Sequence, residues 1–190
     1  MAKRIDFNLF VKQKEVSVSG GLMADALHEL MPVSNELSEV IKLIAPGATI
    51  FWVSNGDWSM HELLLEILNI TGPAVVHLSS YAMSETPARI LAQLKSAGMM
   101  TKLFCVLDNR IDVRTAGSFQ LMKSIADKLV LVDTHAKVTS VVNDKWKIAV
   151  VGSANYTENK RYESGVITLC SDAVEMQINW MQKALKDGIE

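Results

Sequence analysis

Short runs of β-branched and other apolar residues alternate along this chain with segments in which apolar residues recur at helical spacing. Such alternation is typical of a sheet covered by helices. Some of the runs, such as residues 103–107, are entirely apolar, which favours central strands that are covered on both faces. We therefore expect an α/β fold with a mixed central sheet of about seven or eight strands, flanked by helices on both faces.

The expected elements follow from this periodicity and from the capping residues beside it. Strands are predicted at residues 15–19, 48–54, 73–80, 101–108, 128–132, 136–142, 146–152 and 165–170. Helices are predicted at residues 58–68, 84–97, 117–128 and 172–186, and two more within 22–44, where Pro32 interrupts the pattern. Ser84 as a cap and Gly98 just past the end define the second of these helices well.

The length and charge of the chain limit its organisation and its partners. The 190 residues, 49% of them hydrophobic, suit a single domain over residues 1–190, and no repeat or linker divides it. Lys and Arg number 19 against 21 Asp and Glu, so a nucleic-acid partner would need a local basic patch. Lys145, Lys160 and Arg161 are candidates, although short clusters of charge are usually solvated surface.

The sequence gives no reason to expect export or membrane association. The first residues lack a secretory apolar core, and no apolar run approaches the roughly 20 residues that cross a bilayer. We expect a cytoplasmic protein without stable membrane association. Cys105 and Cys170 lie in apolar stretches and have no partner at a metal-binding or redox spacing, so both are interpreted as reduced core residues.

One stretch of the sequence combines the side chains that phosphate chemistry uses. His135 and Lys137 begin an expected hairpin that turns near residues 143–145, and Ser153 and Asn155 follow the returning strand. Residues two apart on a strand share a face, and the two ends of a hairpin meet. The hairpin therefore brings an imidazole, an ammonium, a hydroxyl and an amide toward one point.

This set of groups suits a phosphoryl group. Lys137 can neutralise its charge, Ser153 and Asn155 can donate hydrogen bonds to its oxygens, and His135 can attack phosphorus or transfer a proton near neutral pH. The sequence offers no convincing carboxylate cluster for magnesium or histidine pair for zinc. We expect neither a metal nor another cofactor.

The order His135, Lys137, then Gly152-Ser153-Ala154-Asn155 resembles the phospholipase D superfamily, whose His-Lys-Asp (HKD) motif places His-x-Lys, an Asp and then Gly-Ser-x-Asn on a comparable hairpin. The two strand–helix units before the motif and Glu163 after it extend the resemblance over about residues 45–187, which leaves residues 1–44 as an N-terminal extension. The resemblance implies a small, single-motif, nuclease-like member.

The family's Asp position is altered in this chain. The family has four residues between the Lys and the Asp and six between the Asp and the Gly, whereas Lys137 to Asp144 encloses six and Asp144 to Gly152 encloses seven. Val142 occupies the family's Asp position. We expect Asp144 to lie in or near the turn of a longer hairpin, away from the phosphate site.

The family mechanism implies further residues and a partner. His135 would attack phosphorus to give a phosphohistidine, and a second imidazole would protonate the leaving oxygen and then activate water. One chain carries one motif, so the resemblance implies a homodimer in which the second His135 comes from the other subunit. Glu163 would hold an imidazole in its useful tautomer, in the same subunit or across the dimer.

Other residues have weaker functional signals. Tyr81, at the end of an expected strand, Gly152 and Arg161 are candidates for substrate binding. We expect His77 in a strand of the core, and His28 and His61 at surface positions of helices.

Three functions stay open from the sequence. The favoured one is a metal-independent phosphodiesterase, more specifically an endonuclease on DNA or RNA. A non-catalytic phosphate- or nucleic-acid-binding module with the same fold is the second, and the altered Asp position motivates it. A phospholipid hydrolase or phosphatidyl transferase is the third, for which vesicle binding is the discriminating observation.

Overall fold

The computed structural model describes residues 35–158 and 160–188, which form one seven-stranded sheet with helices on both faces. The strands are β1 (Thr49–Ser54), β2 (Ala74–Ser80), β3 (Met100–Asp108), β4 (Lys128–Val132), β5 (Val138–Val142), β6 (Lys147–Gly152) and β7 (Glu163–Thr168). The predicted α/β class and mixed sheet are confirmed. The strand expected at 15–19 and the helix expected before Pro32 lie outside the described residues.

The order of the strands in the sheet is β1-β7-β6-β5-β2-β3-β4. The pairs β2–β3 and β3–β4 are parallel, whereas β5 pairs antiparallel with both β2 and β6, and β7 pairs antiparallel with both β6 and β1. It follows that β1, β2, β3, β4 and β6 all end at the same edge of the sheet, where β5 and β7 begin. We call it the carboxyl edge.

The helices are α2 (Asn35–Lys42), α3 (Met60–Thr71), α4 (Glu85–Ser96), α5 (Ile111–Arg114), α6 (Ala116–Ile125) and α7 (Ser171–Asp187). A capping box starts α3, because the Ser59 backbone amide donates to Glu62 Oε2 at 2.7 Å. Gly72, with φ of +71°, ends it. The four-residue α5 is an element that the sequence analysis did not predict.

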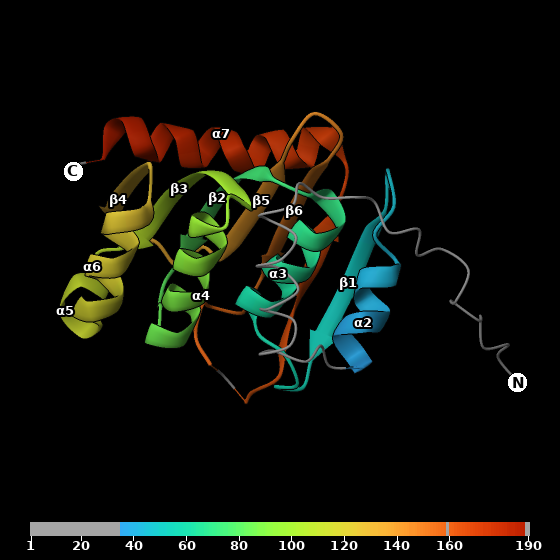
Figure 1. Ribbon diagram of the computed structural model, residues 1–190, viewed down its shortest axis with the longest axis horizontal. Helices are drawn as coiled ribbons and strands as arrows, with labels where there is room; N and C mark the ends of the chain where they lie inside the picture. Colours follow the sequence, from blue (N-terminus) through green and yellow to red (C-terminus); the bar gives the residue numbers. More distant parts are fainter. Residues whose placement is uncertain (1–34, 159, 189–190) are drawn as a thin grey trace, which may run out of the picture.

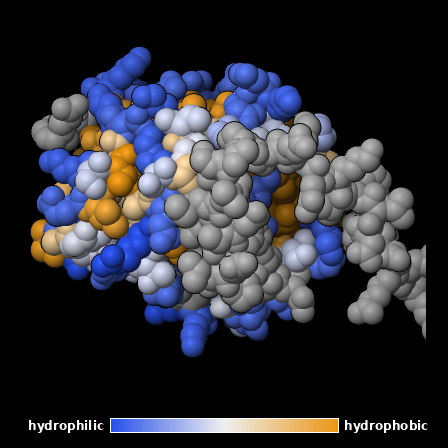
Figure 2. Space-filling model, in the orientation of Figure 1, coloured by the Kyte–Doolittle hydropathy of each residue, from blue (hydrophilic) through white to orange (hydrophobic). Residues whose placement is uncertain are grey.

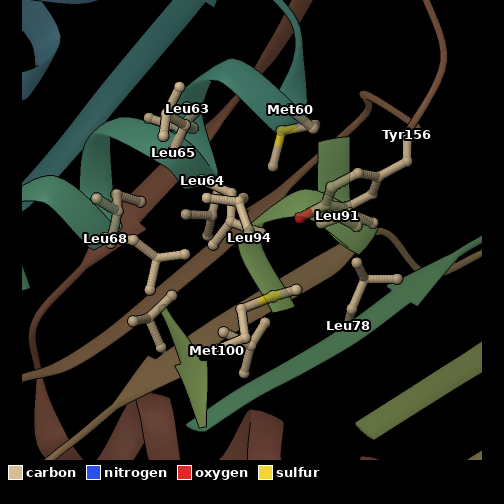
Figure 3. Packing of buried hydrophobic residues seen from close by; sticks show 14 of the residues in the cluster. Met60, Leu63, Leu64, Leu65, Leu68, Leu78, Leu91, Leu94, Met100 and Tyr156 are labelled. Atoms are coloured by element: carbon tan, nitrogen blue, oxygen red, sulfur yellow. The ribbon is translucent and has the colours of Figure 1, made fainter. Parts of the chain in front are cut away.

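Two apolar layers lie on opposite faces of the sheet. Adjacent strand residues point to opposite faces, and Cys105 accordingly belongs to the larger core while Val106 packs with Met181 and Leu185 of α7. Figure 1 shows α7 running along one face, with α3, α4 and α6 on the other. Figure 3 shows the leucines of α3 and α4 packed with Leu78 of β2 in the larger core.

The surface over α4 and α6 is mixed, with hydrophobic residues interspersed among hydrophilic ones (Figure 2). In the part of the chain that the structure describes, no helix has the length and apolar character that a bilayer span needs.

The expectations for four single residues have different outcomes, and a fifth, for His28, lies outside the described residues. Cys105 is buried as predicted, but Cys170 is exposed, because it precedes the first residue of α7 at the rim of the sheet. His77 lies buried in β2 and stacks on Phe104, as expected. The expectation of a surface position for His61 is wrong: it is 3% exposed, because this face of α3 packs into the molecule.

Candidate active site

The predicted site residues come from four segments that meet at the carboxyl edge of the sheet. Tyr81 follows β2, His135 and Lys137 lie between β4 and β5, Ser153 and Asn155 follow β6, and Glu163 is the first residue of β7. Because the strands on either side of β5 end here, residues 74 positions apart in the sequence, Tyr81 and Asn155, are in contact. This is the edge at which open α/β sheets bind ligands.

His135 and Lys137 are adjacent, but not by strand alternation. The strand expected to start at Ala136 starts at Val138, so both residues lie in the segment before β5. The Lys137 side chain turns back, and its Nζ atom lies 3.2 Å from His135 Nδ1 and 2.8 Å from the carbonyl oxygen of His135. The imidazole is exposed and the ammonium is half-buried. This partial burial lowers the pKa of Lys137, against the opposing influence of the Glu163 carboxylate.

Ser153 and Glu163 form a pair across β6 and β7. The Ser153 hydroxyl donates to Glu163 Oε2 and accepts a hydrogen bond of 3.0 Å from the backbone amide of Ser164. A hydroxyl has one hydrogen to donate. In this arrangement the hydroxyl hydrogen is donated to Glu163. The predicted hydrogen bond from Ser153 to a phosphate would require the bond to Glu163 to break, and it stays a prediction.

Asn155 is held by its oxygen. Its Oδ1 atom accepts hydrogen bonds from the backbone amides of Tyr81 and Ala82 at 3.2 and 3.1 Å and from the Ser80 hydroxyl at 3.3 Å. Within residues 35–158 and 160–188 its Nδ2 group has no acceptor. The amide therefore ties the segment after β6 to the end of β2 and keeps two donor hydrogens available.

Tyr81 is at the centre of a group of cations. Its ring centroid lies 4.6 Å from that of His135, and the Lys137 Nζ atom lies 5.3 Å from the ring. The guanidinium carbons of Arg110 and Arg114 lie 4.6 and 5.8 Å from the same centroid. Cations at these distances are attracted to the ring. The sequence placed Tyr81 in the site; the structure shows what it contacts there.

Asp108, Arg110 and Arg114 are residues that the sequence analysis missed. The buried Asp108 carboxylate accepts two hydrogen bonds from the Arg110 guanidinium, at 2.6 and 2.8 Å, and one of 3.3 Å from the backbone amide of Thr134. The hydrogen bond from Arg110 is the main reason that the pKa of Asp108 falls to about 2. A signal was available, because these residues follow a strand that ends at the ligand-binding edge.

Gly152 has a packing role in this structure. A Cβ atom added there would lie 2.7 Å from the Ser164 carbonyl oxygen and 2.9 Å from the Trp52 ring, and an added Cβ at Gly165 would also strike Trp52. The indole lies over this glycine pair and contacts Trp58, which is buried at the start of α3. Substrate binding by Gly152 stays a prediction.

The remaining candidate residues do not form one basic patch. Arg161 is exposed near the carboxyl edge and makes no hydrogen bond or ion pair with another described residue. Lys145 lies in the β5–β6 turn at the opposite edge, so it cannot share a patch with Lys160 and Arg161. Asp144 lies exposed in the same turn, where Asn143 Oδ1 accepts from the backbone amides of Lys145 and Trp146.

The family's Asp position is also remote. Val142 is the last residue of β5 and pairs with Lys147, at the edge opposite to His135. Among the residues that the structure describes, no three His, Cys, Asp or Glu side chains are grouped as metal ligands would be.

Comparison with known proteins gives matches at the level of structure. No protein-family model matches the chain, and no curated protein matches it by sequence. Nuc from Salmonella typhimurium, a phospholipase D family member, is similar over 75% of this chain and 96% of its own, at 19% identity and a TM-score of 0.54. NucT from Helicobacter pylori covers 75% of this chain and 98% of its own, at 17% identity and a TM-score of 0.59.

A polyphosphate kinase from Porphyromonas gingivalis matches 94% of this chain with 30% of its own length, at 13% identity and a TM-score of 0.54. At these identities the likeness concerns the fold. Nearly the whole of Nuc, which is named as a phospholipase D family member, superposes on the sheet and helices described above. The chain has the phospholipase D family fold.

Proposed function

We propose that this chain is a metal-independent phosphodiesterase that acts through a phosphohistidine intermediate, and that it is a nuclease on DNA or RNA. The contact between His135 and Lys137 carries the proposal, because it joins a nucleophile and a cation at the ligand-binding edge. Asn155 accepts from the backbone amide of Tyr81, whose ring contacts His135, and its own amide hydrogens are left for a phosphate.

The reaction is a double displacement at phosphorus. His135 Nε2 attacks phosphorus, the bond from phosphorus to the leaving oxygen breaks, and a second imidazole gives that oxygen its proton. Water then attacks the phosphohistidine, and its proton passes to the second imidazole as the bond between phosphorus and nitrogen breaks. Lys137 and the Asn155 amide stabilise the charge on the other phosphate oxygens.

The second imidazole is proposed to be His135 of another copy of the chain. His77 is 4% exposed in the middle of β2 and His61 is 3% exposed in α3, so neither can approach a phosphate beside His135. A twofold axis near the carboxyl edge would bring two exposed His135 rings to one phosphate.

Glu163 is proposed to orient an imidazole across that axis. Within the chain, the described contacts of the His135 ring are with Tyr81 and Lys137, and Glu163 accepts from Ser153 instead. An Nδ1–H group needs an acceptor if Nε2 is to attack. A carboxylate supplied by the other subunit would meet this need.

The proposal of a nucleic-acid substrate rests on local charge. The chain has a net charge of −2, yet Lys137 and Arg114 lie at the Tyr81 ring, together with Arg110, whose charge is balanced by Asp108. Phosphate contacts by such cations supply most of the affinity of proteins for nucleic acids. The alternative of a phospholipid substrate is tested by a parallel assay of phosphatidylcholine hydrolysis in vesicles.

The test is cleavage of single-stranded and duplex DNA in EDTA, with His135→Ala as the matched variant. We expect cleavage by the wild-type protein, none by the variant, and a phosphoenzyme that is acid-labile and absent from the variant. Loss of activity in EDTA with recovery in magnesium would refute the mechanism. Cleavage of phosphatidylcholine but not DNA would refute the substrate.

A non-catalytic phosphate-binding module is the second candidate. Two observations favour it: Val142 stands at the family's Asp position, and the Ser153 hydroxyl is engaged with Glu163. DNA binding without cleavage, and without any trapped phosphoenzyme, would support this alternative.

A further inference from the structure

Two arginines at the carboxyl edge contact the same tyrosine but differ in how their charge is balanced. Arg110 donates two hydrogen bonds to Asp108, and its guanidinium lies 3.7 Å from Asp133 as well. Arg114, at the end of α5, makes no ion pair with any carboxylate among residues 35–158 and 160–188. The positive charge of Arg110 is thus largely neutralised, and that of Arg114 is not.

The Arg114 guanidinium is nevertheless held in place. Its Nη1 atom donates to the Tyr81 hydroxyl at 3.1 Å, and its carbon lies 5.8 Å from the centroid of the Tyr81 ring. A long side chain that is already ordered loses less conformational entropy when it binds a ligand. An exposed, ordered and unpaired guanidinium is suited to bind an anion, because its planar donors match the oxygens of a phosphate.

The position of this cation relates it to the proposed reaction. Arg114 and His135 contact the same Tyr81 ring, so the guanidinium borders the site at which His135 would attack. In the proposed reaction, Lys137 and Asn155 bind the phosphate that is attacked. Among the described contacts, Arg114 is connected to His135 through the Tyr81 ring alone, so it is available to a phosphate next to the one that reacts.

We propose that Arg114 and Tyr81 form a second phosphate subsite, which binds the phosphate next to the scissile one in a nucleic-acid strand. This inference rests on the proposed nuclease function and specifies its substrate as a polymer with successive phosphates. A phosphatidylcholine molecule has one phosphate and would leave the subsite empty. Arg110 is a positioning residue here, since its guanidinium contacts both the Asp108 carboxylate and the Tyr81 ring and so holds the ring in place.

The test is binding of a fluorescent single-stranded oligothymidylate to the full chain made inactive by His135→Asn, measured over a range of salt concentrations. Adding Arg114→Gln should weaken binding roughly three- to tenfold and reduce the slope of log K against log salt by about 0.7, the loss of one phosphate contact. Arg89→Gln is the matched control, because Arg89 is an exposed arginine of α4 that pairs with Glu85.

A second variant tests whether the loss of binding comes from the Arg114 contact or from a disturbed fold. Tyr81→Phe keeps the ring and removes the hydroxyl that Arg114 contacts, so it should weaken binding less than Arg114→Gln does, with circular dichroism unchanged. Equal effects of Arg114→Gln and Arg89→Gln, or no oligothymidylate binding at all, would overturn the subsite. Strand binding that depends on Arg114, in a wild-type protein that cleaves nothing, would refute the proposed catalysis and leave the subsite standing.

Discussion

The Nζ atom of Lys137 lies 3.2 Å from Nδ1 of His135. An ammonium can only donate, so a charged Lys137 requires a lone pair at Nδ1, which places the proton of a neutral imidazole on Nε2. That tautomer cannot attack phosphorus through Nε2. In the proposed reaction, Lys137 must leave Nδ1 for the substrate phosphate, and an acceptor such as a carboxylate must replace it.

The partial burial of Lys137 predicts a pH dependence. Burial lowers the pKa of Lys137, so its ammonium loses its proton at a lower pH than an ordinary lysine does. As the pH rises through this pKa, the attraction for phosphate is lost and kcat/KM should fall. In Lys137→Arg, whose guanidinium stays charged, this alkaline decline should move upward by roughly one pH unit or more. An identical decline in both proteins, measured by DNA cleavage, would assign it to another group.

The proposed dimer makes a prediction about mixtures. When wild-type protein and His135→Asn are mixed in equal amounts, unfolded and refolded together, half of the dimers should contain one wild-type chain and one variant chain, and so a single His135. If one site needs both His135 residues, the mixture should keep about a quarter of the activity of the same total amount of wild-type protein. If each chain has an independent site, about half should remain. Sedimentation of the mixture should show a dimer. A monomeric, active wild-type protein would contradict this prediction.

The turn position of Asp144 predicts that it has no part in catalysis. Asp144 is exposed in the β5–β6 turn, at the edge of the sheet opposite to His135. Asp144→Ala should leave kcat/KM within about twofold of wild type, as an isolated surface substitution does. His135→Ala should reduce it by about a thousandfold or more. A comparable loss of kcat/KM in both variants would mean that Asp144 takes part in catalysis.

The close approach of β6 and β7 predicts a strong effect of one methyl group. Gly152→Ala should lower the free energy of unfolding by about 1–3 kcal/mol, because its Cβ would strike Trp52 and the Ser164 carbonyl. Gly117→Ala is the control: an added Cβ there meets open space, so stability should be unchanged or rise by up to about 1 kcal/mol. Urea denaturation followed by tryptophan fluorescence measures both, and equal stabilities would contradict the packing role.

The Asp108 carboxylate predicts a loss of stability in acid. Its pKa falls to about 2 in the folded protein, from 3.8, chiefly through the hydrogen bond from Arg110. The unfolded chain therefore takes up the proton first as the pH falls, and the stability that this group contributes above about pH 4 disappears toward pH 2. Asp108→Asn should be about 1–3 kcal/mol less stable at pH 7, with a smaller difference near pH 2. A difference that does not change with pH would mean that the charge is not involved.

Local patterns were sufficient for most of the elements. The apolar run before Asp108 and the cap at Ser84 predicted β3 and α4 closely, because strand periodicity and capping depend on neighbours in the sequence. The predictions were less accurate at the ends of the hairpin. His135 and Lys137 precede β5, since the pairing that defines a strand depends on its partners in the sheet rather than on its own residues.

The sequence by itself determined that His135 and Lys137 would lie near Ser153 and Asn155, because a hairpin brings its own ends together. Only the tertiary structure decided that Asn155 is fixed by the end of β2, that Asp108 anchors Arg110 and the segment before His135, and that Arg114 contacts Tyr81. Apart from the pair of Asp108 and Arg110, these contacts join segments that follow or precede different strands. They depend on the order of strands in the sheet, which is set by packing over the whole molecule and which no local pattern records.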